Sequence, residues 1–94
     1  MYHLIFVCKY RKKLLRVYGE QMKTLLLAIA DEYDIGITQM EADIDHIHML
    51  ISYSPTKSIL EIVRLFKQIS TYRIGRQNNN ERFLQKHFWS EKTF

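Results

Sequence analysis

Segments with a strand-like pattern of hydrophobic residues alternate with segments of helical periodicity along this chain of 94 residues. The order of these segments constrains the fold more than any single residue does. Segments 2–8 and 46–53 are dense in β-branched and aromatic residues, which is typical of strands. Apolar residues in 22–33 instead recur at the i, i+3, i+4, i+7 spacing of a helix that follows Gly19. Segment 37–44 alternates polar and apolar residues and is expected to form a hairpin with 46–53.

A second helix is predicted from about Ser58 to about Ile74. Ser58 and Glu61 fit the capping-box pattern at its start, and Gly75 with the asparagines 78–80 marks its end. A short helix over 81–88 follows. The order strand, helix, strand, strand, helix predicts one α+β domain over residues 1–94, a ferredoxin-like sheet with helices on one face that lacks its last strand.

Charge is distributed unevenly although the net charge is only +4. Residues 1–16 carry +5, residues 17–56 carry −6 and residues 57–94 carry +5. Two basic blocks around an acidic middle indicate a surface for a polyanion beside a patch that suits a cation. A merely solvated, unevenly charged surface is an equal alternative on composition alone.

Cysteine content and hydropathy indicate in which cellular compartment the chain is expected. Cys8 is the only cysteine, so an intramolecular disulfide is excluded and a reducing, cytoplasmic location is expected. No apolar run approaches the roughly 20 residues that a membrane span needs, and no charged leader precedes a cleavage site. We therefore expect no membrane partner.

His46 and His48 are the candidate metal ligands. Side chains alternate along a strand, so both imidazoles are expected on one face, with Ile47 on the other. Two histidines seldom hold a metal alone, which leaves a third ligand open among Asp43, Asp45 and a nearby glutamine; the two aspartates have the wrong strand parity unless a bend intervenes. The spacing by itself favours two incidental histidines on a polar face, because His-x-His is short and common by chance.

Several segments taken in order change that balance. These segments are Tyr2–Lys13, Asp45–Ile51, Ser58–Arg73 and Phe88–Trp89. Together they resemble the single-tyrosine HUH transposases of bacterial and archaeal insertion sequences, the insertion-sequence-200-like family, over nearly all of the chain.

The resemblance implies chemistry on single-stranded DNA. A divalent metal, Mg²⁺ or Mn²⁺, held by His46, His48 and a third polar side chain would polarise a phosphate, and a tyrosine would attack it to form a phosphotyrosine. In the family that tyrosine and a glutamine ligand lie on a helix after the last strand, and none of the six tyrosines here matches the position. The domain is therefore expected to lack both the last strand and the catalytic helix and to keep DNA and metal binding only; whether it is an enzyme, and whether the truncation is natural, stay open.

The resemblance also implies partners: single-stranded DNA with hairpin ends and a second copy of the chain, since the family works as a dimer. A missing last strand would leave the opening strand with an unpaired edge for dimerisation. For the basic residues on the second helix a solvated face is an equal alternative, as is a plain surface role for Tyr10. The residues expected to contact DNA are Lys9, Tyr10, Arg11, Lys12, Lys13, Arg64, Lys67 and Arg73.

Three hypotheses follow for the function. The first is a strand-cleaving transposase, the second a DNA-binding remnant of one, and the third an unrelated ferredoxin-like binding module with incidental histidines. Binding of hairpin DNA separates the third from the others. A covalent tyrosine–DNA adduct separates the first from the second.

Overall fold

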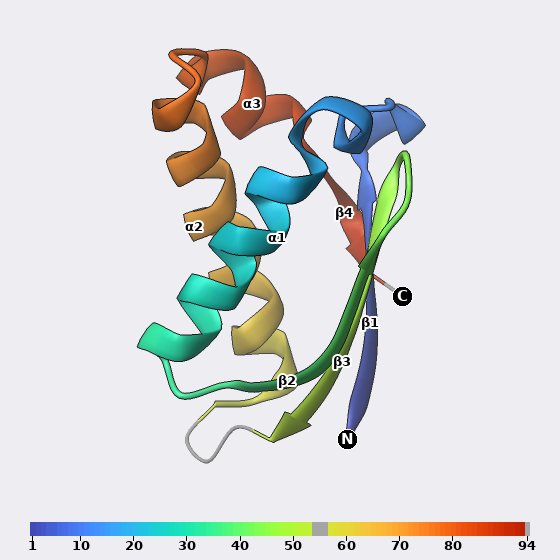
Figure 1. Cartoon of the computed structure of the whole chain (residues 1–94), viewed down its shortest axis with the longest axis vertical. Helices are drawn as coiled ribbons and strands as arrows, with labels where there is room; N and C mark the ends of the chain where they lie inside the picture. The colour runs from blue at the N-terminus through green and yellow to red at the C-terminus, as the bar shows by residue number, and fades with distance from the viewer. Residues whose placement is uncertain (54–56, 94) are drawn as a thin grey trace.

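A four-stranded antiparallel sheet carries the fold. The structure, a computed structural model, describes residues 1–53 and 57–93. The elements are β1 (Tyr2–Cys8), a short 3-10 turn η1 (Lys9–Arg11), α1 (Leu15–Glu32), β2 (Gly36–Ala42), β3 (His46–Tyr53), α2 (Ile59–Gln77), α3 (Glu81–His87) and β4 (Trp89–Thr93). The strand order is β2-β3-β1-β4, with every neighbouring pair antiparallel (Figure 1). This βαββαβ order confirms the ferredoxin-like α+β fold.

The fourth strand corrects the sequence prediction that the last strand is missing. β4 pairs with β1, with Cys8 opposite Trp89 and Phe6 opposite Thr93. Trp89 anchors it, because the buried indole Nε1–H donates to Ser70 Oγ at 3.1 Å and the ring meets Phe6 edge to face. β1 therefore lies inside the sheet, so the expected unpaired edge at β1 is wrong; the edges are β2 and β4. No helix follows β4 within the described residues.

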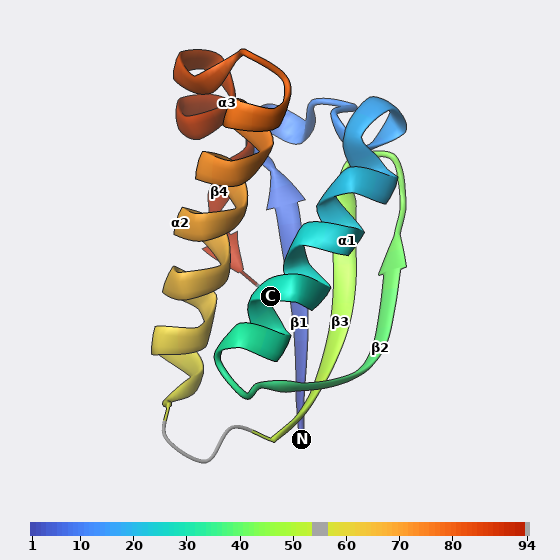
Figure 2. The ribbon, with the colours of Figure 1, turned by 60° about the vertical axis from the view of Figure 1, so that its left-hand side comes forward.

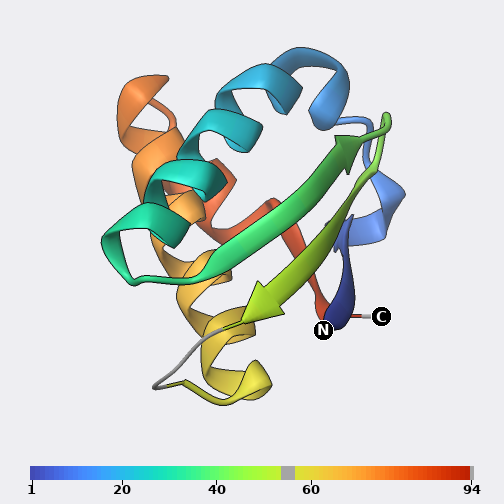
Figure 3. The same ribbon diagram turned by 60° about the horizontal axis from the view of Figure 1, so that its bottom comes forward.

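Both long helices lie on the same face of the sheet (Figures 1 and 2). Alternate residues of the central strands point toward them, among them Phe6, Ile47 and Met49, each with 0% exposure. Within the described residues no helix covers the opposite face of the sheet, and Figure 3 shows the twist of the β2–β3 hairpin that forms one side of that sheet. Neither long helix in this part of the chain combines the length and the apolar surface that crossing a bilayer demands.

The helices extend beyond two glycines that the sequence pattern predicts as boundaries. α1 begins at Leu15 rather than after Gly19, because Leu15 is buried and its N–H bonds to the carbonyl of Ile44. α2 continues through the buried Gly75 to Gln77. A glycine inside a helix costs about 1 kcal/mol relative to alanine, which packing of the flanking apolar residues offsets. The predicted cap at Ser58 is confirmed, since its Oγ accepts from the N–H of Glu61 at 3.2 Å.

Candidate metal and nucleic-acid site

The two histidines of β3 lie on the sheet face that the helices leave uncovered. His46 pairs with Val7 of β1 and His48 with Ile5, whereas Ile47 between them is fully buried toward the helices. Because strand residues alternate faces, both imidazoles project to the same side, as the sequence predicts. We call this surface the open face; it carries residues 46, 48 and 50 of β3 and residues 3, 5 and 7 of β1.

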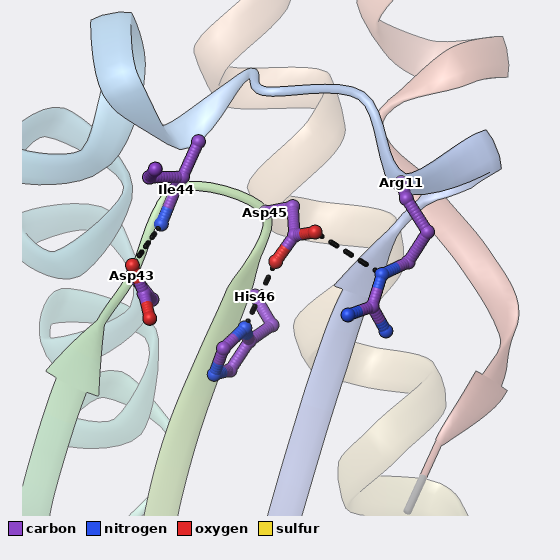
Figure 4. A network of polar contacts seen from close by, with 5 residues as sticks. All are labelled: Arg11, Asp43, Ile44, Asp45 and His46. Atoms are coloured by element: carbon purple, nitrogen blue, oxygen red, sulfur yellow. Dashed lines mark hydrogen bonds and ion pairs between the residues drawn. The ribbon is translucent and has the colours of Figure 1, made fainter.

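Asp45 contacts the first of these histidines directly (Figure 4). It lies in the bend between β2 and β3, where strand parity no longer applies, and its Oδ1 is 3.0 Å from His46 Nδ1. The other oxygen, Oδ2, accepts from Arg11 Nε at 3.1 Å. The hydrogen bond from His46 and then the charge of Arg11 lower the pKa of the Asp45 carboxyl. The Asp45 carboxylate therefore engages Nδ1 of His46, and Nε2 is left as the ring nitrogen that is available to a metal.

Asp43, the other aspartate considered as a third ligand, serves the turn instead. Its Oδ1 accepts from the backbone N–H of Ile44 at 2.7 Å (Figure 4). This bond to the adjacent residue engages one oxygen of the Asp43 carboxylate within the turn. Neither aspartate is therefore placed as a ligand on the open side of the imidazoles.

His48 has a neighbour that sequence reasoning missed. His3 Nδ1 lies 3.1 Å from His48 Nε2, and the two rings stack with centroids 5.3 Å apart. His3 faces Leu50 in the β1–β3 register, so it sits diagonally to His48. The signal was available in the sequence, because His3 has the strand parity of Ile5, but the diagonal contact depends on a register that the sequence does not state. Metal binding at Nε2 of His48 requires this contact to open.

His46 and His48 fit a metal site only in part. Two neutral imidazoles on one face, one of them oriented by a carboxylate, suit a divalent transition metal. Among residues 1–53 and 57–93, no three His, Cys, Asp or Glu side chains are grouped so as to hold an ion. The described residues thus offer two candidate ligands, and a metal site here would need a third from another group.

The basic turn after β1 lies next to this site. Tyr10 and Arg11 both have left-handed backbone conformations, with φ of 57° and 53°, which non-glycine residues rarely adopt. The turn thereby presents Tyr10, 76% exposed, to solvent, while Arg11 reaches Asp45. Lys12 lies over the ring of Phe83, and Lys9 donates to the Lys86 carbonyl. Of the five residues of this turn predicted to contact DNA, Arg11 is the one that the described contacts bring to the Asp45–His46 pair, whereas Lys9 and Lys12 contact α3.

The basic residues of α2 have a different environment. Lys67 donates to the Ser90 carbonyl of β4 at 2.9 Å and lies over the Phe6 ring, and partial burial lowers its pKa. Arg73 makes a bidentate ion pair with Glu32 of α1, which lowers the pKa of that carboxyl. Arg64 is exposed. All three belong to a helix on the covered face, so the structure does not bring them together with the histidines, and their DNA contacts stay predictions.

Comparison with known proteins places the chain in a family. The family model described as "Transposase IS200 like" matches residues 1–94. The chain belongs to this transposase family. Among curated members it is 34% identical over 74 residues to the ISDra2 transposase TnpA of Deinococcus radiodurans, an alignment that covers 78% of this chain and 53% of that protein. It is 28% identical over 93 residues to the transposase for insertion sequence element IS200 of Salmonella typhimurium, over 94% of this chain and 60% of that protein.

Solved structures agree with this transposase fold. A transposase candidate from Deinococcus radiodurans R1 superposes with a TM-score of 0.83 at 24% identity, covering 98% of this chain and 73% of the other. A REP-associated tyrosine transposase bound to a REP hairpin superposes with a TM-score of 0.67 at 13% identity, covering 98% of this chain and 51% of the other. The chain spans between half and two thirds of the length of the curated transposases it matches.

Proposed function

We propose that this member of the IS200-like transposase family binds single-stranded DNA at hairpin ends and a divalent metal, Mg²⁺ or Mn²⁺, on the open face. The observation that carries the proposal is the pair of imidazoles on one side of β3, with a carboxylate on His46 Nδ1 and a basic turn adjoining it. A bound cation there supplies charge stabilisation to a phosphate oxygen. A hairpin also occupies the transposase of known structure with the same fold.

Each group has a distinct task in this proposal. His46 and His48 donate nitrogen lone pairs to the metal. Lys12 and Lys13 neutralise backbone phosphates, and Tyr10 offers an exposed ring on which an unpaired base stacks.

For the 94 residues themselves we propose binding without strand cleavage. None of the six tyrosines matches the position that the resemblance gives to the nucleophile of the family. Incubation with a hairpin oligonucleotide and Mn²⁺ is therefore expected to give no covalent adduct on a denaturing gel; an adduct would show that one of these tyrosines attacks.

We also propose a homodimer. β2 is an edge strand whose residues are exposed or half-buried, so its outer backbone groups are available to a second chain. Sedimentation analysis is expected to give twice the mass of the chain. A monodisperse monomer at high protein concentration would contradict this part of the proposal.

Salt dependence tests DNA binding. Affinity for a labelled hairpin, followed by fluorescence anisotropy, should fall linearly in log–log form with added salt, by about 0.7 in slope for each phosphate contact on a single strand. Replacing Lys12 and Lys13 by glutamine should reduce that slope by the same amount, about 0.7, for each lost contact. The matched variant Lys23→Gln removes one charge from α1 and should leave the slope unchanged. A flat salt response of the unmodified chain would remove the proposal.

A second candidate function rests on the His3–His48 contact. If Nε2 of His48 is permanently engaged by His3 at 3.1 Å, the histidines pack against each other and the chain is a ferredoxin-like binding module with incidental histidines. The two candidates differ in metal binding. Saturable Mn²⁺ binding that disappears in His46→Gln supports the transposase site, whereas its absence in the unmodified chain supports the second candidate.

A further inference from the structure

Three side chains from two distant segments form one hydrogen-bonded chain. Arg11 Nε donates to Asp45 Oδ2 at 3.1 Å, and the other oxygen of the same carboxylate lies 3.0 Å from His46 Nδ1 (Figure 4). Arg11 belongs to the basic turn and His46 to the metal-ligand pair. Asp45 is therefore the connection between the surface proposed for phosphate and the atom proposed for the metal.

The contact determines which nitrogen of His46 can bind a metal. Asp45 is an ionised acceptor, so Nδ1 of the imidazole must carry the hydrogen and donate it. The lone pair of a neutral ring then resides on Nε2, which points away from the carboxylate in Figure 4. Without Asp45 the ring is free to exchange the hydrogen between its nitrogens and to rotate, which weakens a metal ligand.

Asp45 is itself held from two sides. Its backbone carbonyl accepts from the N–H of Cys8 at 2.8 Å, which fixes the bend against the end of β1. Arg11 fixes the carboxylate through Nε alone, and its two Nη groups point away from Asp45 (Figure 4). With 68% of the Arg11 side chain exposed, those groups are accessible to a phosphate while the Asp45 contact persists.

We infer that Asp45 is a positioning residue that orients His46 Nε2 toward the metal, and that Arg11 links this orientation to a bound phosphate. The inference rests on the proposed function and adds a partner for the ligand. It has a thermodynamic consequence: if phosphate on Arg11 tightens the Arg11–Asp45–His46 chain, DNA raises metal affinity and the metal raises DNA affinity by the same factor. In this arrangement Asp45 touches neither metal nor DNA.

The hydrogen position on His46 tests the inference without any metal. A ¹⁵N–¹H correlation spectrum at about pH 8 should show His46 as the Nδ1–H form in the unmodified chain, and a mixture of both forms in Asp45→Ala. Asp45→Asn should keep the Nδ1–H form, because the amide oxygen still accepts. Asp43→Asn, which alters the neighbouring carboxylate in the same turn, should leave His46 unchanged. An Nε2–H form in the unmodified chain would overturn the inference.

Metal affinity tests the consequence. Asp45→Ala should weaken Mn²⁺ binding by about 10- to 100-fold, and Asp45→Asn should recover part of the loss. Arg11→Gln should abolish the mutual enhancement of metal and hairpin binding, whereas Arg16→Gln, an equal loss of charge on an exposed side chain of α1, should preserve it. Equal Mn²⁺ affinity in Asp45→Ala and the unmodified chain would overturn the inference. If the unmodified chain binds no Mn²⁺ while His46 holds the Nδ1–H form, the proposed metal function fails and the orienting role of Asp45 stands.

Discussion

The two faces of the sheet differ in the burial and the contacts of the side chains that the same strands place on them. On the covered face Phe6, Ile47 and Met49 pack against α1 and α2 with 0% exposure. On the open face, their immediate neighbours include His46 and His48, which are half-buried and make polar contacts with Asp45 and His3. Adjacent residues on β3 thus face the core and the proposed metal site in turn.

Because of this difference, stability and the proposed ligand binding are expected to depend on different residues of the same strand. Because strand side chains alternate, a substitution at position 47 and one at position 46 or 48 affect opposite surfaces. The covered face should respond in the free energy of unfolding, and the open face should respond in ligand binding.

The largest effect is expected from Phe6→Ala. Phe6 is fully buried and meets Phe66 and Trp89 edge to face, so truncation leaves a cavity and should cost about 3–5 kcal/mol of unfolding free energy in urea. The matched variant Ile5→Ala removes a half-buried side chain from the open face of the same strand and should cost much less. Equal losses for the two variants would contradict the assignment of the core to one face.

A smaller effect is expected at the Ser70–Trp89 hydrogen bond, which attaches β4 to α2. Ser70→Ala leaves the indole N–H buried without this partner and should cost about 1–3 kcal/mol. Trp89→Phe removes the indole N–H that donates this bond. In the double variant Ser70→Ala/Trp89→Phe no donor is left buried without a partner, so the loss of unfolding free energy should be smaller than the sum of the two single losses. Additive losses, within about 0.5 kcal/mol, would mean that the bond does not stabilise β4.

The buried thiol of Cys8, on the covered face, is expected to make the free energy of unfolding depend on pH. Burial raises the pKa of its thiol to about 11, from an ordinary value of 9.0. The folded state therefore retains the proton that the unfolded chain loses first, so this contribution to stability is present below pH 9 and is lost as pH rises toward 11. Cys8→Ala should lose less stability than the unmodified chain over that interval in chemical denaturation. Parallel pH profiles for the two chains would contradict the prediction.

Periodicity made much of the fold predictable. The alternation around Ile47 correctly predicts which face His46 and His48 occupy, and the apolar spacing after Gly19 correctly predicts α1 apart from its first turn. β4 was missed because Trp89–Thr93 is short and places Ser90 and Glu91 where a buried strand would have apolar residues. Its pairing depends on Trp89, whose partner Ser70 lies 19 residues away.

The positions of the proposed ligands were predictable from the sequence, but the contacts around them were not. Strand parity places Asp45 away from His46 unless a bend intervenes, and the bend at residues 44–45 does bring the Asp45 carboxylate to His46. Charge patterns identify basic residues without showing their partners, so Lys67 and Arg73 could not be distinguished from the turn 9–13. Their bonds to β4 and α1 depend on tertiary packing.

The smallest effect on stability and the largest effect on binding are expected from the histidines. Replacing His46 and His48 by glutamine alters half-buried residues outside the core and should change the unfolding free energy by no more than about 0.5 kcal/mol. The same double variant tests the metal site itself. Titration of Mn²⁺ followed by electron paramagnetic resonance should show saturable binding to the unmodified chain and none to a folded double variant. Identical titrations of the two proteins would contradict a metal site on the open face.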